Sequence, residues 1–174
     1  DLDRVVSTTD PYGYETYTVY DARGRTVEVG REYLPGAYAI TTSSYDPVGN
    51  RIAETDANGN VTSYEYDAMD RPVLVTDPLG AAMEFTYDAN GNRLTRTDAL
   101  GNTWEWLYTN RDEVVGERDP TGVAKVYDYF LDDQLESIRD PFTGGRRKFT
   151  YSCCGRLASE TTWVDGGDGD IVVT

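Results

Sequence analysis

Aromatic residues alternate with smaller or charged residues in short stretches along this chain. In four of these stretches, every second residue belongs to a set that ends at a tyrosine, with smaller or charged residues in between. The four sets are Thr62/Tyr64/Tyr66, Met83/Phe85/Tyr87, Trp104/Trp106/Tyr108 and Lys125/Tyr127/Tyr129. Phe149 stands two residues before Tyr151 in the same way. A period of two, built from aromatic and β-branched residues, is typical of a strand. Each stretch therefore predicts a strand whose aromatic side chains share one face.

A second, shorter stretch follows each tyrosine after seven residues and is also predicted to be a strand. Its apolar positions are Ile52, Val73, Leu94 and Val115, within residues 51–56, 72–77, 93–98 and 114–119. Each unit of the sequence is therefore expected to hold two antiparallel strands and two turns. The predicted fold class is all-β, with repeated antiparallel hairpins and almost no helix.

The tyrosines recur with a fixed period. Tyr45, Tyr66, Tyr87, Tyr108 and Tyr129 follow one another at a constant interval of about 21 residues, and Tyr151 comes one position later than this interval would place it. An aspartate stands eleven residues after each of the first five, at Asp56, Asp77, Asp98, Asp119 and Asp140. A glycine stands three residues after four of these aspartates, at Gly59, Gly80, Gly101 and Gly122. We predict that these tyrosines, aspartates and glycines are structural repeat residues.

The turns have recognisable chemistry. Asp-Pro-x-Gly at residues 77–80 and 119–122 places Asp, Pro and Gly at the first, second and fourth positions of a type I turn. The other turn of the unit, as at residues 89–92, offers Asn and Gly for positive φ in a tight hairpin.

Three places depart from the pattern. The interval between Tyr20 and Tyr45 is longer than the others by four positions, and Arg31 stands where an aspartate is expected. This insertion predicts a bulge or a longer loop there. Thr109 and Phe130 replace the aspartate that follows the other tyrosines, so the sheet is expected to be irregular at both.

The run YDANGNRLTRTDALGN at residues 87–102 carries a family resemblance, and YDPVGNRIAETDANGN at 45–60 and YDAMDRPVLVTDPLG at 66–80 repeat it. These runs resemble the Rhs/YD-repeat family. The resemblance implies a β-sheet that coils into a hollow shell, as in bacterial Rhs and wall-associated polymorphic toxins, the cocoon of toxin complexes and teneurins. It makes the chain a single YD-repeat segment over residues 1–174, and a piece of a longer protein. Its units begin near Tyr20, Tyr45, Tyr66, Tyr87, Tyr108, Tyr129 and Tyr151, and residues 165–174 form a Gly/Asp-rich tail.

The function implied by the resemblance is a non-catalytic shell segment around a toxin or other cargo, secreted or at the cell surface. The alternative is an extracellular adhesive or filament-forming structural repeat protein. In either case, the expected partners are neighbouring repeats or copies of the same chain, and a shell would add an encapsulated protein.

Charge and composition indicate which classes of partner are disfavoured and how thick a hydrophobic core to expect. With 31 acidic and 16 basic residues the net charge is −15, which disfavours nucleic acid and anionic membranes. No stretch approaches the roughly 18 apolar residues of a membrane span, so membrane insertion is not expected. The hydrophobic share of 39% includes 14 tyrosines, which predicts a thin sheet wetted on at least one face.

No residue is predicted to be catalytic, to bind a cofactor or to bind a metal. The chain has no histidine, and the acid pairs Asp132/Asp133 and Asp67/Asp70 fall at turn positions. Cys153 and Cys154 are adjacent and are expected to be turn residues without a metal.

Two further patterns have an ordinary structural interpretation. The tail at residues 165–170 resembles a calcium-binding Gly/Asp repeat, but Ile171 stands where that repeat needs aspartate, so a loop before a strand at 171–174 is favoured. The aromatic residues, including Trp104 and Trp106, could stack on sugars if they faced water. Their recurrence in every unit favours packing between adjacent strands.

Overall fold

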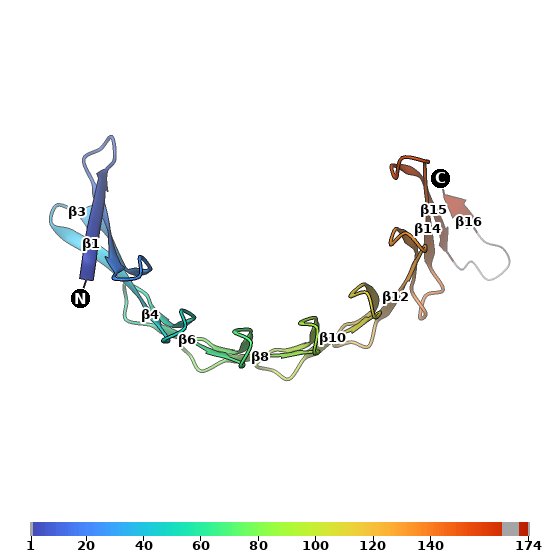
Figure 1. Ribbon diagram of the computed structural model, residues 1–174, viewed down its shortest axis with the longest axis horizontal. Coiled ribbons are helices and arrows are strands. Elements are labelled where there is room, and N and C mark those ends of the chain that lie inside the picture. The colour runs from blue at the N-terminus through green and yellow to red at the C-terminus, as the bar shows by residue number, and fades with distance from the viewer. Residues whose placement is uncertain (1, 165–170, 174) are drawn as a thin grey trace. The chain divides into compact units, whose positions relative to one another are not determined.

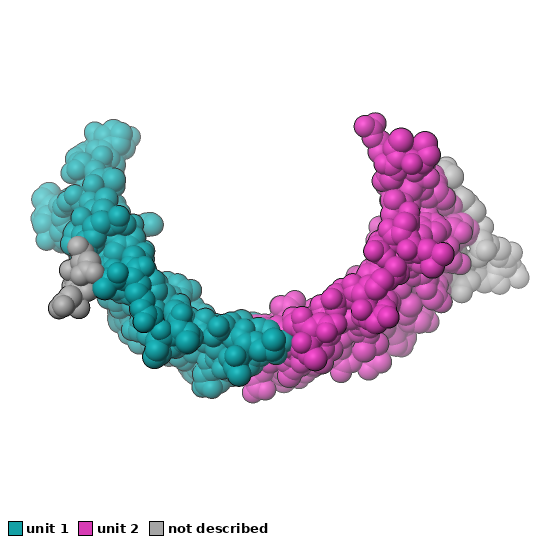
Figure 2. Space-filling view, in the orientation of Figure 1, with its two compact units in different colours: residues 1–83 teal, residues 84–174 magenta. Residues whose placement is uncertain are grey.

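The computed structural model describes residues 2–164 and 171–173, and these residues form only strands and turns. Sixteen strands follow one another in this described part of the chain, and it contains no helix. The chain divides into two compact units, residues 1–83 and 84–174 (Figure 2). The prediction of an all-β fold of antiparallel hairpins is confirmed.

Each unit is a succession of hairpins in chain order (Figure 1). In the first unit every strand pairs antiparallel with the next. Its strands are β1 (Leu2–Thr9), β2 (Glu15–Asp21), β3 (Thr26–Leu34), β4 (Ala37–Tyr45), β5 (Arg51–Thr55), β6 (Val61–Tyr66) and β7 (Pro72–Thr76).

The second unit continues the same pattern, again with antiparallel pairing throughout. Its strands are β8 (Ala82–Tyr87, beginning just before the boundary), β9 (Arg93–Thr97), β10 (Thr103–Tyr108), β11 (Val114–Arg118), β12 (Ala124–Tyr129), β13 (Leu135–Arg139), β14 (Arg146–Tyr151), β15 (Leu157–Val164) and β16 (Ile171–Val173). The strand expected at the C-terminal end is present as β16. The loop expected at residues 165–170 lies outside the described residues.

Within each unit, the aromatic residues at the repeat positions share one face of the sheet, as predicted. Along β6 the burial alternates, with Thr62, Tyr64 and Tyr66 half-buried and the residues between them exposed. Across the strands Tyr64 lies opposite Val75, and Trp106 lies opposite Glu117. We call this side of each unit the tyrosine face; it carries Tyr64 in the first unit, and Phe85, Trp106, Tyr127 and Phe149 in the second.

A β-bulge precedes the tyrosine at the end of each hairpin. In β6 and β7, for example, Glu65 pairs with Leu74 and Tyr66 with Pro72, which leaves Val73 as the extra residue. Ile52, Leu94 and Val115 occupy the equivalent place in their hairpins. The residues that mark the second strand in the sequence are therefore its bulge residues, which the period alone does not predict. A bulge increases the local twist and bends the strand.

The repeat between Tyr20 and Tyr45 differs from the others by an additional bulge and by longer strands. A register shift between Glu32 and Leu34 confirms the bulge that the insertion predicts. The alternative of a longer loop is wrong, because β3 and β4 are nine residues each and only Pro35 and Gly36 separate them. The insertion therefore lengthens the strands.

The interior is as thin as the composition predicts. Among the residues whose side chains are described, Val19 and Phe149 are the only buried hydrophobic residues, at 7% and 9% exposure. Gly30, Gly116 and Ser137 are the other buried residues in this part of the chain. Neither unit has a second layer, so each strand depends on its two neighbours for stability.

The described residues also contain no helix of the length and apolarity that a membrane span requires.

Candidate functional site

The turns and the tyrosines beside them are the parts of the molecule in which the repeated residues meet. In the turn at residues 98–102, the N–H of Asp98 donates to Asn102 O and that of Gly101 donates to Asp98 O. The Asp98 carboxylate accepts the N–H of Leu100 and of Asn102 through Oδ1, both at 2.9 Å. Its Oδ2 accepts Nδ2 of Asn102 at 2.8 Å. One carboxylate thus satisfies three donors, and Gly101 supplies the positive φ of 82°.

The two turns of a unit, which have different sequence signatures, have the same hydrogen bonding. At residues 88–92 the N–H of Asp88 donates to Asn92 O, and that of Gly91 donates to Asp88 O. The carboxylate of Asp88 accepts the N–H of Asn90 and of Asn92, at 2.9 and 2.8 Å. Both turns are therefore built on the pattern Asp-x-x-Gly.

The fifth turn residue completes the turn in many hairpins. Asn60 and Asn102 donate to the carboxylates of Asp56 and Asp98 through Nδ2. Arg25 and Arg71 donate to Asp21 and Asp67 through Nε, at 2.7 Å in each case. Sequence reasoning missed this position, although the recurrence of Asn or Arg four residues after Asp was visible.

These contacts lower the pKa of the turn carboxylates. Donation by the side chain of Asn60 is the main reason that the pKa of Asp56 lies below its ordinary value. The side chain of Asn102 lowers the pKa of Asp98 in the same way, and that of Arg71 lowers the pKa of Asp67. The charged form is therefore favoured in the folded turn.

Each repeat tyrosine with a described partner binds the backbone of the preceding hairpin. The hydroxyl of Tyr66 donates to Arg51 O at 2.9 Å, that of Tyr108 to Arg93 O at 3.0 Å and that of Tyr129 to Val114 O at 2.8 Å. Tyr45 and Tyr151 bind Thr26 O and Leu135 O, at 2.7 and 3.0 Å. Each acceptor is the first residue of a strand.

The place of this bond explains why a tyrosine is required. Strands β5 and β6 pair only through Ala53, Glu54 and Thr55, so the ladder between them stops before Arg51. The Tyr66 hydroxyl reaches across this diverging end to the Arg51 carbonyl. A phenylalanine would pack in the same place but leave that carbonyl without the donor. We call this bond the tyrosine bridge.

Successive turns beside the tyrosines also touch. Nδ2 of Asn50 donates to Asp70 Oδ1 at 2.7 Å, and Nδ2 of Asn92 donates to Asp112 Oδ1 at 2.7 Å. Arg111 forms an ion pair with Asp133 at 2.5 Å. Asp70, Asp112 and Asp133 occupy the fourth turn position with φ of 60°, 65° and 65°. Aspartate accepts this conformation better than most residues, and here its carboxylate joins one turn to the next.

The expected irregularity at Thr109 and Phe130 was wrong for the backbone of both turns. Thr109 N–H donates to Glu113 O at 2.9 Å and Phe130 N–H donates to Gln134 O at 2.8 Å, as in the aspartate turns. The Thr109 hydroxyl accepts the N–H of Arg111 and of Glu113 and so takes over the role of the carboxylate.

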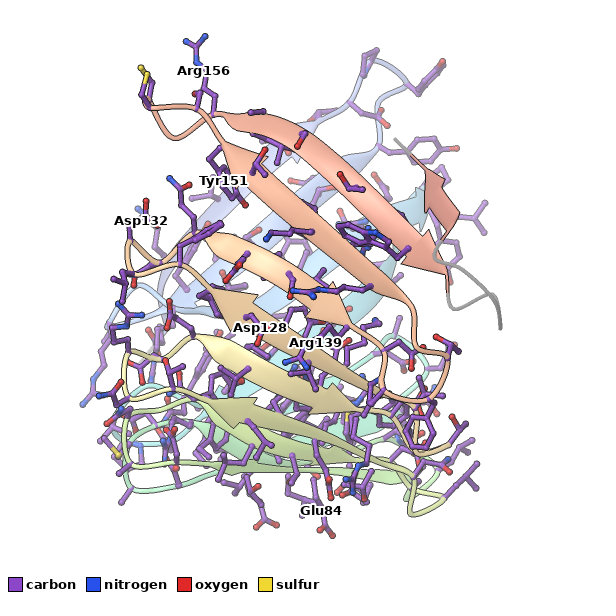
Figure 3. The ribbon with its side chains drawn as sticks, turned by 90° about the vertical axis from the view of Figure 1, so that its right-hand side faces the viewer. Glu84, Asp128, Asp132, Arg139, Tyr151 and Arg156 are labelled. Atoms are coloured by element: carbon purple, nitrogen blue, oxygen red, sulfur yellow. The ribbon has the colours of Figure 1, made fainter. Side chains whose placement is uncertain are left out.

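The other singled-out residues also lie in turns. Asp132 and Asp133 belong to the turn after Tyr129, and Figure 3 shows Asp132 and Arg156 projecting from turns of the second unit. Cys153 and Cys154 are exposed in the turn closed by Ser152 and Arg156, with their sulfurs 3.7 Å apart. Over residues 2–164 and 171–173 there is no group of three or more His, Cys, Asp or Glu side chains that could hold a metal ion. The calcium-like tail lies outside the described residues.

The face opposite the tyrosine face carries an ion-paired cluster in the second unit. In the second unit Asp128 and Arg139 lie side by side there (Figure 3), with Nε and Nη2 of Arg139 each 2.9 Å from a carboxylate oxygen. The fully buried Ser137 donates to the same carboxylate at 2.7 Å. Arg139 first, and then Ser137, hold the pKa of Asp128 below its ordinary value. The cluster is self-satisfied, which indicates a structural role.

The family model described as RHS Repeat matches residues 45–82 and 87–124. Residues 45–82 and 87–124 are RHS repeats. The resemblance to the Rhs/YD-repeat family is thereby confirmed, and each match spans a tyrosine bridge and its turns. The RHS match supports a structural role for the sheet. None of the curated proteins matches the sequence.

Several solved structures are similar to the chain. The crystal structure of TcdB2-TccC3-TEV is 13% identical with a TM-score of 0.40, over 92% of this chain and 14% of that one. The Tc holotoxin pore of Photorhabdus luminescens is 13% identical with a TM-score of 0.39, over 95% and 12%. A porin-like protein from Bacteroides uniformis is 11% identical with a TM-score of 0.40, over 97% and 92%. The chain thus spans a small part of the two toxin chains.

Proposed function

We propose that this chain is a non-catalytic wall segment of a β-shell made of RHS repeats, which encloses a toxin or other cargo polypeptide. The observation that carries the proposal is the tyrosine bridge, which recurs within both units and joins the hairpins of Tyr45, Tyr66, Tyr108, Tyr129 and Tyr151 to the ones before them. A wall needs this kind of joint, because its strength must lie between neighbours in the sheet.

The thin interior supports the same role. With two buried hydrophobic residues among those described, a hairpin has no core of its own and is stabilised by the hairpins on either side. Strand edges readily accept further strands, so neighbouring repeats or copies of the chain are the partners to expect. The repeat residues from Tyr45 to Asp140 are then structural, and the net charge of −15 keeps nucleic acid away.

A secreted or cell-surface location goes with this function. An adhesive or filament-forming surface protein built from the same repeats is the alternative, and it differs in the domains that come after the repeats along the parent chain. A shell segment has further repeats that close the sheet and a separate cargo domain. A filament has repeats that pair between chains.

The test uses the full-length parent protein. Limited proteolysis should leave a cargo domain intact inside the native protein, and electron micrographs should show hollow particles. In a variant with Tyr66→Phe and Tyr108→Phe, which lacks two tyrosine bridges, the cargo should be cleaved at lower denaturant concentration. Fibres without hollow particles, or a parent chain without any domain beyond its repeats, would exclude the shell and leave the filament.

A further inference from the structure

One sequence repeat carries two tryptophans on the tyrosine face, at positions where the other repeats carry smaller residues. Trp104 stands at the place of Thr62, Met83 and Lys125, while Trp106 stands at that of Tyr64 and Tyr127. Both side chains are half-buried on β10. Packing of adjacent strands is met by the smaller residues in the other units, so it does not by itself require two indoles.

An arginine side chain lies over one side of each indole. The guanidinium carbon of Arg96 lies 3.9 Å from the ring centroid of Trp104, and that of Arg93 lies 4.5 Å from that of Trp106. Both arginines come from β9, which flanks β10 on one side. The opposite ring faces are therefore directed toward β11, on the other side of β10.

A groove of about 230 Å³ lies on that side. It is lined by the two tryptophans and by residues of β11, β12 and the turn between them: Glu117, Arg118, Asp119, Val123 and Lys125. Glu117 lies opposite both Trp106 and Lys125 in the strand register and accepts Nζ of Lys125 at 2.8 Å. In the part of the chain that the structure describes, neither indole N–H has a hydrogen-bond acceptor, so both remain available to a ligand.

We propose that this groove binds one sugar ring of a neutral saccharide. A sugar presents C–H groups that pack on an aromatic face and hydroxyls that both donate and accept. The groove offers both partners, with indole faces on one wall, the Glu117 carboxylate as an acceptor, and Lys125 and the indole N–H groups as donors. An apolar surface with a few convergent polar groups is the usual form of a small-ligand site.

The charge of the lining selects a neutral ligand. Glu117 accepts Nζ of Lys125, and the Asp119 carboxylate accepts the N–H of Thr121 and of Val123 in its own turn, so each charge on this face already has a partner. The Arg118 side chain lies on the other face of the sheet, where it pairs with Glu105. Arg93 and Arg96, stacked behind the indoles, disfavour a cationic ligand. The net charge of −15 on the whole chain disfavours an anionic one. This inference does not depend on the shell proposal, because the groove lies within one unit of the sheet.

The experiment titrates the 174-residue chain with four neutral oligosaccharides, maltohexaose, cellohexaose, hexa-N-acetylchitohexaose and mannohexaose, and follows the indole N–H signals by NMR. At least one should shift the signals of Trp104 and Trp106 saturably and leave that of Trp163 unchanged. A heparin hexasaccharide is the charged comparison and should bind more weakly. The absence of a saturable shift with all four neutral sugars, or tighter binding of heparin, would overturn the proposal.

The repeat itself supplies variants that should fold. Trp104→Thr and Trp106→Tyr install residues found at the same places in other units, at Thr62 and Tyr64. Each should keep the β-sheet circular dichroism and weaken sugar binding by roughly tenfold or more, that is, by at least about 1.4 kcal/mol. Trp163→Phe, outside the groove, should leave binding unchanged. Native affinity in Trp104→Thr would show that the sugar binds elsewhere and would refute the site.

Discussion

The turn after Tyr45 and the turn after Tyr129 occupy equivalent places in different units, but they begin with different residues. Asp46 accepts the N–H of Gly49 and of Asn50, at 2.6 and 2.8 Å. Phe130 has no oxygen to offer, and its ring lies edge-on to Tyr151 with centroids 6.3 Å apart. The first residue N–H nevertheless donates to the fifth residue carbonyl in both, at 2.9 and 2.8 Å.

The comparison separates the shape of the turn from its reinforcement. The closing bond and the bulge before the tyrosine are common to both hairpins, so the backbone arrangement does not need the carboxylate. The carboxylate adds hydrogen bonds inside its own turn, whereas Phe130 adds a contact with the ring of the next repeat tyrosine. The residue at this position can thus stabilise either its own turn, through hydrogen bonds, or the contact with the next hairpin, through ring packing.

The largest difference should come from the fourth turn position. Gly49 has φ of 120°, a conformation that side chains rarely adopt, and Asp133 has φ of 65°. Gly49→Val should lower the free energy of unfolding by about 1–3 kcal/mol, because the backbone is strained whatever space surrounds it. Asp133→Gly should change it far less, since the backbone already suits glycine and only the exposed ion pair with Arg111 is lost. Urea unfolding of the two variants measures both values, and equal losses would contradict this explanation.

The tyrosine bridges should be worth the same beside either turn. Tyr45 donates to Thr26 O at 2.7 Å and Tyr129 to Val114 O at 2.8 Å. Tyr45→Phe and Tyr129→Phe each remove one hydrogen bond and keep the ring, so each should cost about 1 kcal/mol. Denaturant melts of the two variants provide the measurement. A loss confined to Tyr45→Phe would mean that the bridge acts only together with an aspartate turn.

The sequence predicted the strands and the shared aromatic face well, because the alternation within each strand and the longer period of the tyrosines both survive in the fold. It could not reveal that Val73 is a bulge residue, since an apolar residue fits a regular strand equally well. Nor could it reveal the acceptor of the Tyr66 hydroxyl, because that carbonyl belongs to Arg51 of another hairpin. Such contacts depend on where neighbouring strands diverge, and the local alternation of residues does not predict that place.

Removing the capping carboxylate should have a smaller effect than straining the backbone. Asp46→Ala loses both N–H contacts and the 3.1 Å bond from Asn50 Nδ2, so the melting temperature should fall by a few degrees. Asp46→Asn keeps an acceptor oxygen and should fall less. Phe130→Ala is the matched variant at the other turn and should lose only the ring contact with Tyr151. Differential scanning calorimetry of the three variants would measure the three melting temperatures. A larger decrease for Asp46→Asn than for Asp46→Ala would contradict this prediction.

The smallest expected effect is a dependence on pH that only the aspartate turn can show. Burial raises the pKa of Asp46, but donation by the N–H groups of Gly49 and Asn50 and by the Asn50 side chain outweighs it, so the pKa lies below its ordinary value. A carboxylate with a lowered pKa contributes stability above its unfolded pKa and loses it as the pH falls through the folded value. The native chain should therefore be more stable than Asp46→Asn at about pH 6, and the difference should shrink as the pH falls below about 4. Melting curves of both proteins from about pH 6 to about pH 2.5 provide the measurement, with Phe130→Ala as a control that should keep a constant difference from the native chain. A difference between native and Asp46→Asn that stays constant over this range would show that the carboxylate acts only through the shape of its oxygen atoms and not through its charge.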